Sequence, residues 1–178
     1  LPAKVNTAAR EIAYSLWLAG FDVKDVTMTD LVTGRETLDD INFIVFCGGF
    51  SNSDVLGSAK GWAGAILFSP KAKETIDRFY ARKDTLSLGI CNGCQLMMEL
   101  GLITPEHEQK GSMQHNNSHK FESNFVGLHV PENNSVLFGS LSGTKHGIWV
   151  AHGEGKFLLP YEESRYHVEA KYNYAGYP

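Results

Sequence analysis

The sequence lacks three features that would each assign it to a particular class of protein. It has no run of about 18 apolar residues, the length that a membrane-spanning helix needs, and no signal-like apolar segment. Its lysines and arginines are scattered, and its net charge of -4 argues against a nucleic-acid surface. We therefore expect neither a membrane nor a nucleic acid among its partners.

Cysteine is also scarce. The 3 cysteines, Cys47, Cys91 and Cys94, cannot form an even disulfide framework, which indicates a reducing compartment, the cytoplasm. The chain contains no internal repeat and no low-complexity stretch. Its 178 residues are 43% hydrophobic, enough for the core of one domain spanning 1–178 and too apolar for a disordered chain.

Hydrophobic periodicity predicts strands that alternate with helices in the first part of the chain. Apolar residues at helical spacing, followed by Gly20, predict a helix over 7–18. Alternating apolar and polar residues predict a strand over 21–28, and the continuous apolar run 43–47 predicts a strand buried on both faces. Further along, the pattern predicts a helix over 71–82 that begins at Pro70, a strand over 85–90 and a helix over 92–100.

After Thr104-Pro105 the pattern changes to a polar loop over 106–118, followed by short strands that include antiparallel ones. We expect these strands at 121–130, 135–138, 147–151 and 168–172. The whole order predicts an α/β fold: a doubly wound, mostly parallel sheet flanked by helices, with added antiparallel strands in the C-terminal part. Ligands of such folds bind beyond the carboxyl ends of the strands, where Gly48-Gly49 and Cys91 both lie.

Cys91 is the candidate nucleophile, because it lies where a predicted strand turns into a predicted helix. Gly89 and Gly93 flank it at two residues on each side, which is the pattern of a nucleophile elbow with a tight, strained turn. The positive end of the following helix favours an ionised thiol and a developing oxyanion. Cys91 and Cys94 also form a C-x-x-C pattern, so a redox pair or a metal site is the alternative; Cys94 otherwise fills the core.

An acyl-transfer site also needs donors for the negative charge that forms on the substrate oxygen. The backbone amides of Gly49 or Phe50, just after a buried strand, could face that of Asn92 and form such an oxyanion hole. A plain Gly-Gly turn is the simpler interpretation of Gly48-Gly49 alone, and it is the pairing with the elbow that favours the functional one.

The base is less clearly marked. His152 and Glu154 would lie on one face of a strand and could form a Cys-His-Glu triad, although side chains at this spacing are about 7 Å apart along a strand. His107, His115 and His119 have irregular spacing in a polar stretch, so we expect them to face solvent and to bind no metal.

Four motifs, in this order, resemble the class I glutamine amidotransferase domain of the phosphoribosylformylglycinamidine synthase family. They are Gly48-Gly49-Phe50-Ser51 with Asp54; Leu88-Gly89-Ile90-Cys91-Asn92-Gly93-Cys94-Gln95; Asn116 with Ser118, Phe121 and Glu122; and Ala151-His152-Gly153-Glu154-Gly155. The resemblance covers nearly the whole chain, and it implies a flavodoxin-like amidotransferase fold.

The resemblance implies a glutaminase that works for purine biosynthesis. Cys91 would attack the side-chain amide of glutamine, form a thioester and release ammonia, with Gly49 and Phe50 in the oxyanion loop and Gln95 lining the glutamine pocket. A synthetase domain or subunit would use the ammonia and ATP with magnesium to convert formylglycinamide ribonucleotide into the amidine. No cofactor is expected in this domain itself.

The chain also departs from that family. There, the catalytic histidine and glutamate belong to a Met-Pro-His-x-Glu-Arg segment beyond a Tyr-Pro such as Tyr177-Pro178, and an apolar strand precedes the residue matching Asn6. The resemblance thus implies a domain cut at both ends, with little glutaminase activity by itself and a structural or pocket-lining role for His152 and Glu154. A stand-alone cysteine hydrolase of the same fold and a non-catalytic domain with a vestigial cysteine are the alternatives.

Overall fold

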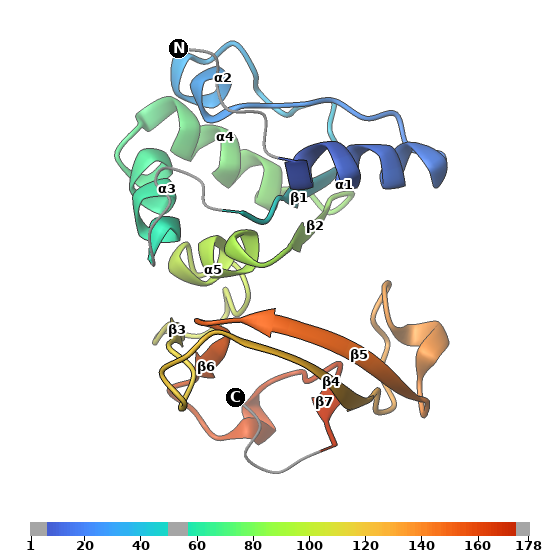
Figure 1. Ribbon diagram of the computed structural model, residues 1–178. Coiled ribbons are helices and arrows are strands. Elements are labelled where there is room, and N and C mark those ends of the chain that lie inside the picture. The colour runs from blue at the N-terminus through green and yellow to red at the C-terminus, as the bar shows by residue number, and fades with distance from the viewer. Residues whose placement is uncertain (1–6, 50–56, 174–178) are drawn as a thin grey trace. The chain divides into compact units, whose positions relative to one another are not determined.

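The computed structural model describes residues 7–49 and 57–173. The chain forms two compact units, Leu1–Ile103 and Thr104–Pro178, and each is described by itself (Figure 1). The first unit contains a parallel strand pair with helices, and the second contains antiparallel sheets. This mixed α/β architecture, with its antiparallel strands in the C-terminal part, confirms the predicted fold class.

The first unit alternates helices and strands along the chain. Its elements are α1 (Thr7–Leu18), α2 (Met28–Thr33), β1 (Phe43–Phe46), α3 (Ser58–Leu67), α4 (Pro70–Ala81), β2 (Leu86–Gly89) and α5 (Asn92–Glu99). β1 and β2 pair in parallel, with Phe43 opposite Leu86 and Phe46 opposite Gly89. Parallel strands need a crossover connection, and α3 and α4 supply it here.

Helices pack around this strand pair to form the core of the first unit. α3 packs against α4 and α5, and α5 contacts both strands. Ile66 and Leu96 are fully buried where these helices meet, and Ile76 and Phe79 of α4 are buried as well. The core therefore holds α5 firmly against the ends of β1 and β2, which fixes the turn between β2 and α5.

The predicted helices of this unit are confirmed, and local sequence explains their ends. α1 covers 7–18, and Gly20 follows it with a φ of 92°. α4 begins with Pro70 after Ser69, whose hydroxyl accepts a hydrogen bond from the Ala72 amide at 3.4 Å. β1 was expected to be buried on both faces, but only Phe46 is buried, because β2 is its only strand neighbour within the described residues.

The strand predicted over 21–28 is wrong. Residues 21–27 form no ladder, and Met28 begins α2. Thr27 and Asp30 form a capping box, in which the Thr27 hydroxyl accepts from the Asp30 amide and the Asp30 carboxylate accepts from the Thr27 amide. Alternating apolar and polar residues indicate an extended backbone but do not guarantee a neighbouring strand to pair with. Within the described residues, no strand pairs with this segment.

The second unit is built mainly from antiparallel strands. Its elements are β3 (Ser112–Gln114), β4 (Glu122–His129), the short 3-10 helix η1 (Gly139–Leu141), β5 (Lys145–His152), β6 (Lys156–Leu158), the 3-10 helix η2 (Glu163–Arg165) and β7 (Lys171–Tyr172). β4 lies between β5 and β7 in one sheet, and β3 pairs with β6 in another. Figure 1 shows β4 and β5 running side by side as the longest pair of this unit.

Two of the four strands predicted here need correction. The segment 135–138 is a turn, because the Asn133 side chain accepts from the Ser135 amide and the Ser135 hydroxyl accepts from the amides of Leu137 and Phe138. Such side-chain bonds to backbone compete with a ladder. The strand predicted over 168–172 shortens to β7, whereas β4 and β5 confirm the other two predictions.

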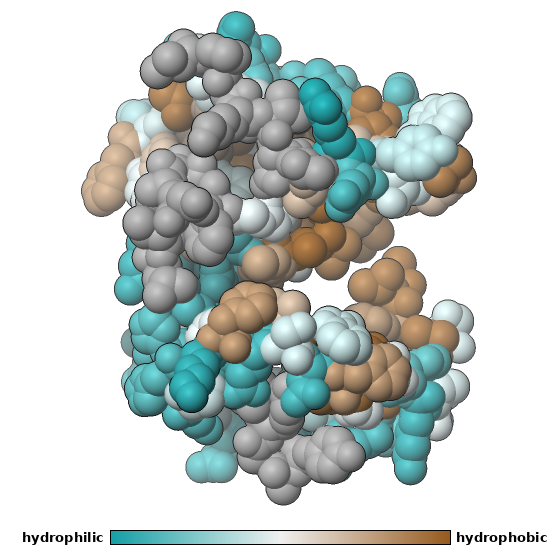
Figure 2. All heavy atoms as spheres, in the orientation of Figure 1, coloured by the Kyte–Doolittle hydropathy of each residue, from teal (hydrophilic) through white to brown (hydrophobic). Residues whose placement is uncertain are grey.

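Both units leave large apolar side chains at the surface, and Figure 2 shows apolar groups exposed on each. On α1, the stacked rings of Tyr14 and Trp17 are both exposed. On the β4–β5 pair, Phe125 lies directly opposite Trp149, and the Trp149 indole donates to the Ser123 hydroxyl at 2.9 Å. Val126 and Val150 point to the other, buried face of the same strands.

Candidate active site

Cys91 occupies the turn that joins β2 to α5, as the sequence predicted. It is the N-cap residue of α5, its side chain is exposed, and its backbone has φ 55° and ψ −113°. A positive φ is rare for a residue with a Cβ atom and marks a strained backbone. The turn therefore presents a thiol to solvent at the end of a strand, in the conformation that a nucleophile elbow requires.

The two flanking glycines are there because nothing larger fits. A Cβ on Gly93 would lie 1.9 Å from the carbonyl oxygen of Phe46, and one on Gly89 would lie 2.8 Å from the Cα of Cys94 and 2.7 Å from the sulfur of Met97. Real Cβ atoms do not approach other atoms this closely. The predicted absence of bulk on both sides of Cys91 is thus a packing requirement of β1, β2 and α5.

Hydrogen bonds fix the shape of this turn. The Gly93 amide donates to the carbonyl of Ile90 at 2.9 Å, and the amides of Cys94 and Gln95 donate to the carbonyl of Cys91 at 3.0 and 3.1 Å. The amides of these three residues are therefore bonded within the turn. Asn92, which is 3% exposed, remains the residue of this turn that the sequence predicts as an oxyanion donor.

The end of β1 reaches the same place. The Ile90 amide donates to the Phe46 carbonyl at 3.0 Å, and a Cβ on Gly48 would lie 3.1 Å from the Cβ of Cys91. Gly49 follows with a φ of 90°, which suits a glycine. The carboxyl ends of the two parallel strands thus meet at Cys91. Phe50, the other predicted member of the oxyanion loop, lies outside the described residues.

The remaining residues of the motif belong to α5. Cys94 and Gln95 are both partly buried in its first turn. Burial raises the pKa of the Cys94 thiol, which suits the core-filling role that the sequence predicted for it. All 3 cysteines are free thiols. Gly48, which the sequence placed in the Gly-Gly turn beside the elbow, packs directly against Cys91.

His152 and Glu154 belong to the second unit and do not form a pair. His152 ends β5, so the two side chains do not share a strand face. The His152 ring bonds through Nδ1 to the Asn116 side-chain oxygen at 2.9 Å, whereas Glu154 Oε1 lies 3.5 Å from Nδ1 of His115. Each therefore contacts a residue of the 115–116 segment instead of the other.

Asn116 connects this part of the second unit. Its side chain is fully buried and donates to the carbonyls of His152 and Lys120 at 2.8 and 3.1 Å. Its backbone amide donates to the Gly153 carbonyl. A Cβ on Gly155 would lie 2.5 Å from the His152 ring, so the ring packs directly over that glycine. The Asn116 motif and the 151–155 motif, far apart in sequence, are thus one structural cluster.

The expectation that three histidines face solvent holds for His115 and His119 but is wrong for His107. His107 is 8% exposed, because its ring packs edge-on against the rings of Tyr161 and Tyr166. Among residues 7–49 and 57–173, no group of three or more metal-ligating side chains is close enough to hold an ion.

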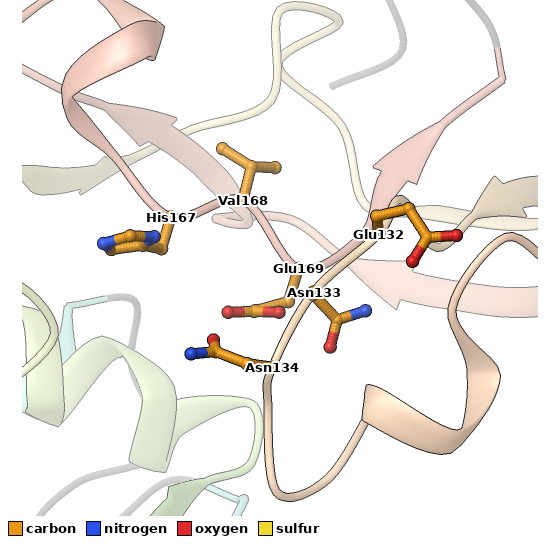
Figure 3. Close-up of a pocket in the computed structure, with 6 residues that line it drawn as sticks. All are labelled: Glu132, Asn133, Asn134, His167, Val168 and Glu169. Carbon is orange, nitrogen blue, oxygen red and sulfur yellow. The ribbon is translucent and has the colours of Figure 1, made fainter.

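A cavity of about 250 Å³ lies elsewhere in the second unit (Figure 3). It is lined by Glu132, Asn133, Asn134, His167, Val168 and Glu169. Asn133 is held in place by hydrogen bonds to Pro131 and Ser142. None of the predicted site residues lines this cavity.

The fold and the site together define a class: an α/β domain with a cysteine at a strand–turn–helix elbow, as in glutamine amidotransferases and related cysteine hydrolases. A family described as the CobB/CobQ-like glutamine amidotransferase domain matches residues 5–176. The chain belongs to this family. The resemblance found in the sequence is thereby confirmed.

Individual relatives agree with this assignment. The chain is 40% identical, over 91% of its length, to the phosphoribosylformylglycinamidine synthase of Drosophila melanogaster, and 39% identical to that of Homo sapiens over the same share. A solved structure of PurLQS from Thermotoga maritima superposes with a TM-score of 0.71 at 30% identity, covering 94% of this chain and 70% of that one.

The curated relatives are much longer than this chain. The matched region spans 12% of the Drosophila protein and 13% of the human one. In the part of the chain that the structure describes, we find no helix with the length and apolar character needed to cross a bilayer.

Proposed function

We propose that this chain is the glutaminase part of a phosphoribosylformylglycinamidine synthase and works as the amidotransferase domain of a larger enzyme. The observation that carries the proposal is the exposed thiol of Cys91 in a strained turn between β2 and α5. Membership of a glutamine amidotransferase family and the names of the relatives support it.

The proposed chemistry begins with attack of the Cys91 sulfur on the side-chain carboxamide carbon of glutamine. Backbone amides of Gly49, Phe50 and Asn92 stabilise the oxyanion that develops, and ammonia leaves as the thioester forms. Water then cleaves the thioester, which releases glutamate and restores the thiol. The position of Cys91 at the positive end of the α5 dipole supports this assignment, and Gln95 in the first turn of α5 lines the glutamine pocket.

The ammonia goes to a synthetase domain or subunit, which is the proposed partner. There, ATP with magnesium activates the amide oxygen of formylglycinamide ribonucleotide, and ammonia displaces it to give formylglycinamidine ribonucleotide. The glutaminase chemistry proposed for this chain requires no cofactor of its own, since the cysteine supplies the nucleophile and backbone amides supply the charge stabilisation. The cytoplasm is the proposed compartment.

Labelling with a diazo-ketone analogue of norleucine, an electrophile that mimics glutamine, tests the proposal. We expect one covalent adduct, on the tryptic peptide 84–110 that contains Cys91, and excess glutamine should slow its formation. Cys91→Ser should abolish the adduct. Cys47→Ser is the matched control, because this thiol lies at the end of β1 and should leave labelling unchanged.

Labelling that is spread over all three thiols, or that glutamine does not slow, would contradict the proposal. Either result would favour a reactive cysteine without a glutamine pocket.

A further inference from the structure

Two thiols share the first turn of α5, and the glutaminase chemistry uses only one of them. Cys91 is exposed at the N-cap, and Cys94 follows three residues later, partly buried. The Cys94 amide donates to the Cys91 carbonyl at 3.0 Å, so the two residues close a hydrogen-bonded turn. Such a turn keeps its end Cα atoms within about 7 Å, and disulfides need about 4.4–6.8 Å.

The third thiol is oriented differently. Cys47 follows β1, and its sulfur lies 3.8 Å from the carbonyl oxygen of Val45 on its own strand. The neighbouring residue, Gly48, is the one whose Cβ position faces Cys91, and side chains of successive residues in extended chain point to opposite sides. Cys94, in the same turn as Cys91, is therefore the better-placed partner for it.

We propose that Cys91 and Cys94 form a reversible disulfide when the domain meets a peroxide, and that Cys94 thereby protects the nucleophile from irreversible oxidation. The regulatory meaning of this site rests on the proposed function, because only a catalytic Cys91 would be switched off by it. The disulfide itself depends only on the geometry of the turn.

The chemistry balances with hydrogen peroxide as the oxidant. The Cys91 sulfur attacks one peroxide oxygen, the O–O bond breaks, and Cys91 becomes a sulfenic acid while hydroxide leaves and takes up a proton to give water. The Cys94 sulfur then attacks the Cys91 sulfur. The S–S bond forms, the S–O bond breaks, and the oxygen leaves as a second water with the proton of the Cys94 thiol. Two thiols and one peroxide thus give one disulfide and two waters.

The different burial of Cys91 and Cys94 gives the two thiols different roles in this reaction. Because burial raises the pKa of the Cys94 thiol, this sulfur stays protonated and reacts slowly with peroxide from solvent. The exposed Cys91 sulfur meets the oxidant first. In the disulfide this sulfur is bonded to a second sulfur and cannot ionise to a thiolate, so it cannot attack a carboxamide to form a thioester until a thiol reductant cleaves the S–S bond.

The test compares the wild-type chain with Cys94→Ser and with the control Cys47→Ser. Each is treated with hydrogen peroxide, digested, and analysed by mass spectrometry before and after dithiothreitol. We expect peptide 84–110 of the wild type and of Cys47→Ser to lose two hydrogens and to regain both after reduction. Maleimide labelling of Cys91 should then recover fully.

Cys94→Ser should instead carry sulfinic or sulfonic acid at Cys91, and its maleimide labelling after reduction should fall about tenfold below that of the wild type. Circular dichroism checks that the variant is folded, and Cys94→Ala serves if the serine destabilises the turn. The proposal is overturned if Cys91 over-oxidises equally with and without Cys94, or if the disulfide joins Cys91 to Cys47. These measurements report the oxidation state of the cysteine sulfurs and do not involve glutamine, so their outcome is independent of the test of the proposed glutaminase function.

Discussion

The carbonyl oxygen of Phe46 lies 1.9 Å from the position that a Cβ on Gly93 would occupy. The same oxygen accepts the hydrogen bond of the Ile90 amide, which extends the β1–β2 pair up to the turn that holds Cys91. One backbone atom of β1 therefore fixes both the pairing of the strands and the approach of α5. The position of the candidate nucleophile depends on this contact.

The first prediction concerns this contact. Gly93→Ala should lower the free energy of unfolding by at least about 3 kcal/mol, because a backbone carbonyl cannot move aside without breaking the strand pair. Gly64→Ala is the matched control: it is also a helical glycine, and its Cβ would lie 3.7 Å from the Phe68 ring. This control should be neutral or stabilise by up to about 1 kcal/mol. Urea unfolding followed by circular dichroism measures both, and equal stabilities would refute the packing argument.

The second prediction concerns Asn116 in the second unit. Asn116→Ala should cost about 2–4 kcal/mol, because it removes a fully buried side chain that donates to the carbonyls of His152 and Lys120 and bonds to the His152 ring. Its neighbour Asn117 is exposed and its side-chain oxygen accepts a hydrogen bond from Lys156, so it gives the control Asn117→Ala, which should stay within about 0.5 kcal/mol.

Hydrogen exchange should locate the Asn116 effect. In Asn116→Ala we expect faster exchange of the β4 and β5 amides, with the first unit unchanged. Exchange that rises evenly over the whole chain would show that Asn116 does not act through the 151–155 segment.

The third prediction is a loss of stability at alkaline pH. In the folded chain, burial raises the pKa of the Cys94 and Cys47 thiols above their ordinary value of 9.0. Burial likewise raises the pKa of the Tyr80 hydroxyl. The folded state then binds more protons than the unfolded state above pH 9.0, so the stabilisation is present below that pH and is lost as the pH rises.

Urea unfolding at a series of pH values measures this effect. The wild type should lose stability as the pH is raised above 9.0, and the double variant Cys47→Ala with Cys94→Ala should lose less over the same range. If the free energy of unfolding falls equally with pH in the two proteins, the thiols are as accessible in the folded state as in the unfolded one.

Local patterns predicted the elements whose ends are set by nearby residues. Ser69-Pro70 starts α4, Gly20 follows α1, and the elbow around Cys91 has the expected strand, turn and helix. The same reasoning failed at 21–28 and 135–138. In both places short polar side chains, those of Thr27 and Asp30 and of Asn133 and Ser135, bond to nearby backbone and so favour a cap or a turn.

The sequence by itself determined where the candidate nucleophile lies, because a strand, a glycine-flanked cysteine and a helix are adjacent in the chain. Only the tertiary structure decided that Gly48 faces Cys91 and that Phe46 excludes any side chain at Gly93. Within the second unit, it decided that the His152 ring bonds to Asn116 and not to Glu154. These relationships join segments up to 47 residues apart in the case of Phe46 and Gly93. They depend on how strands and helices pack, which no local pattern of residues records.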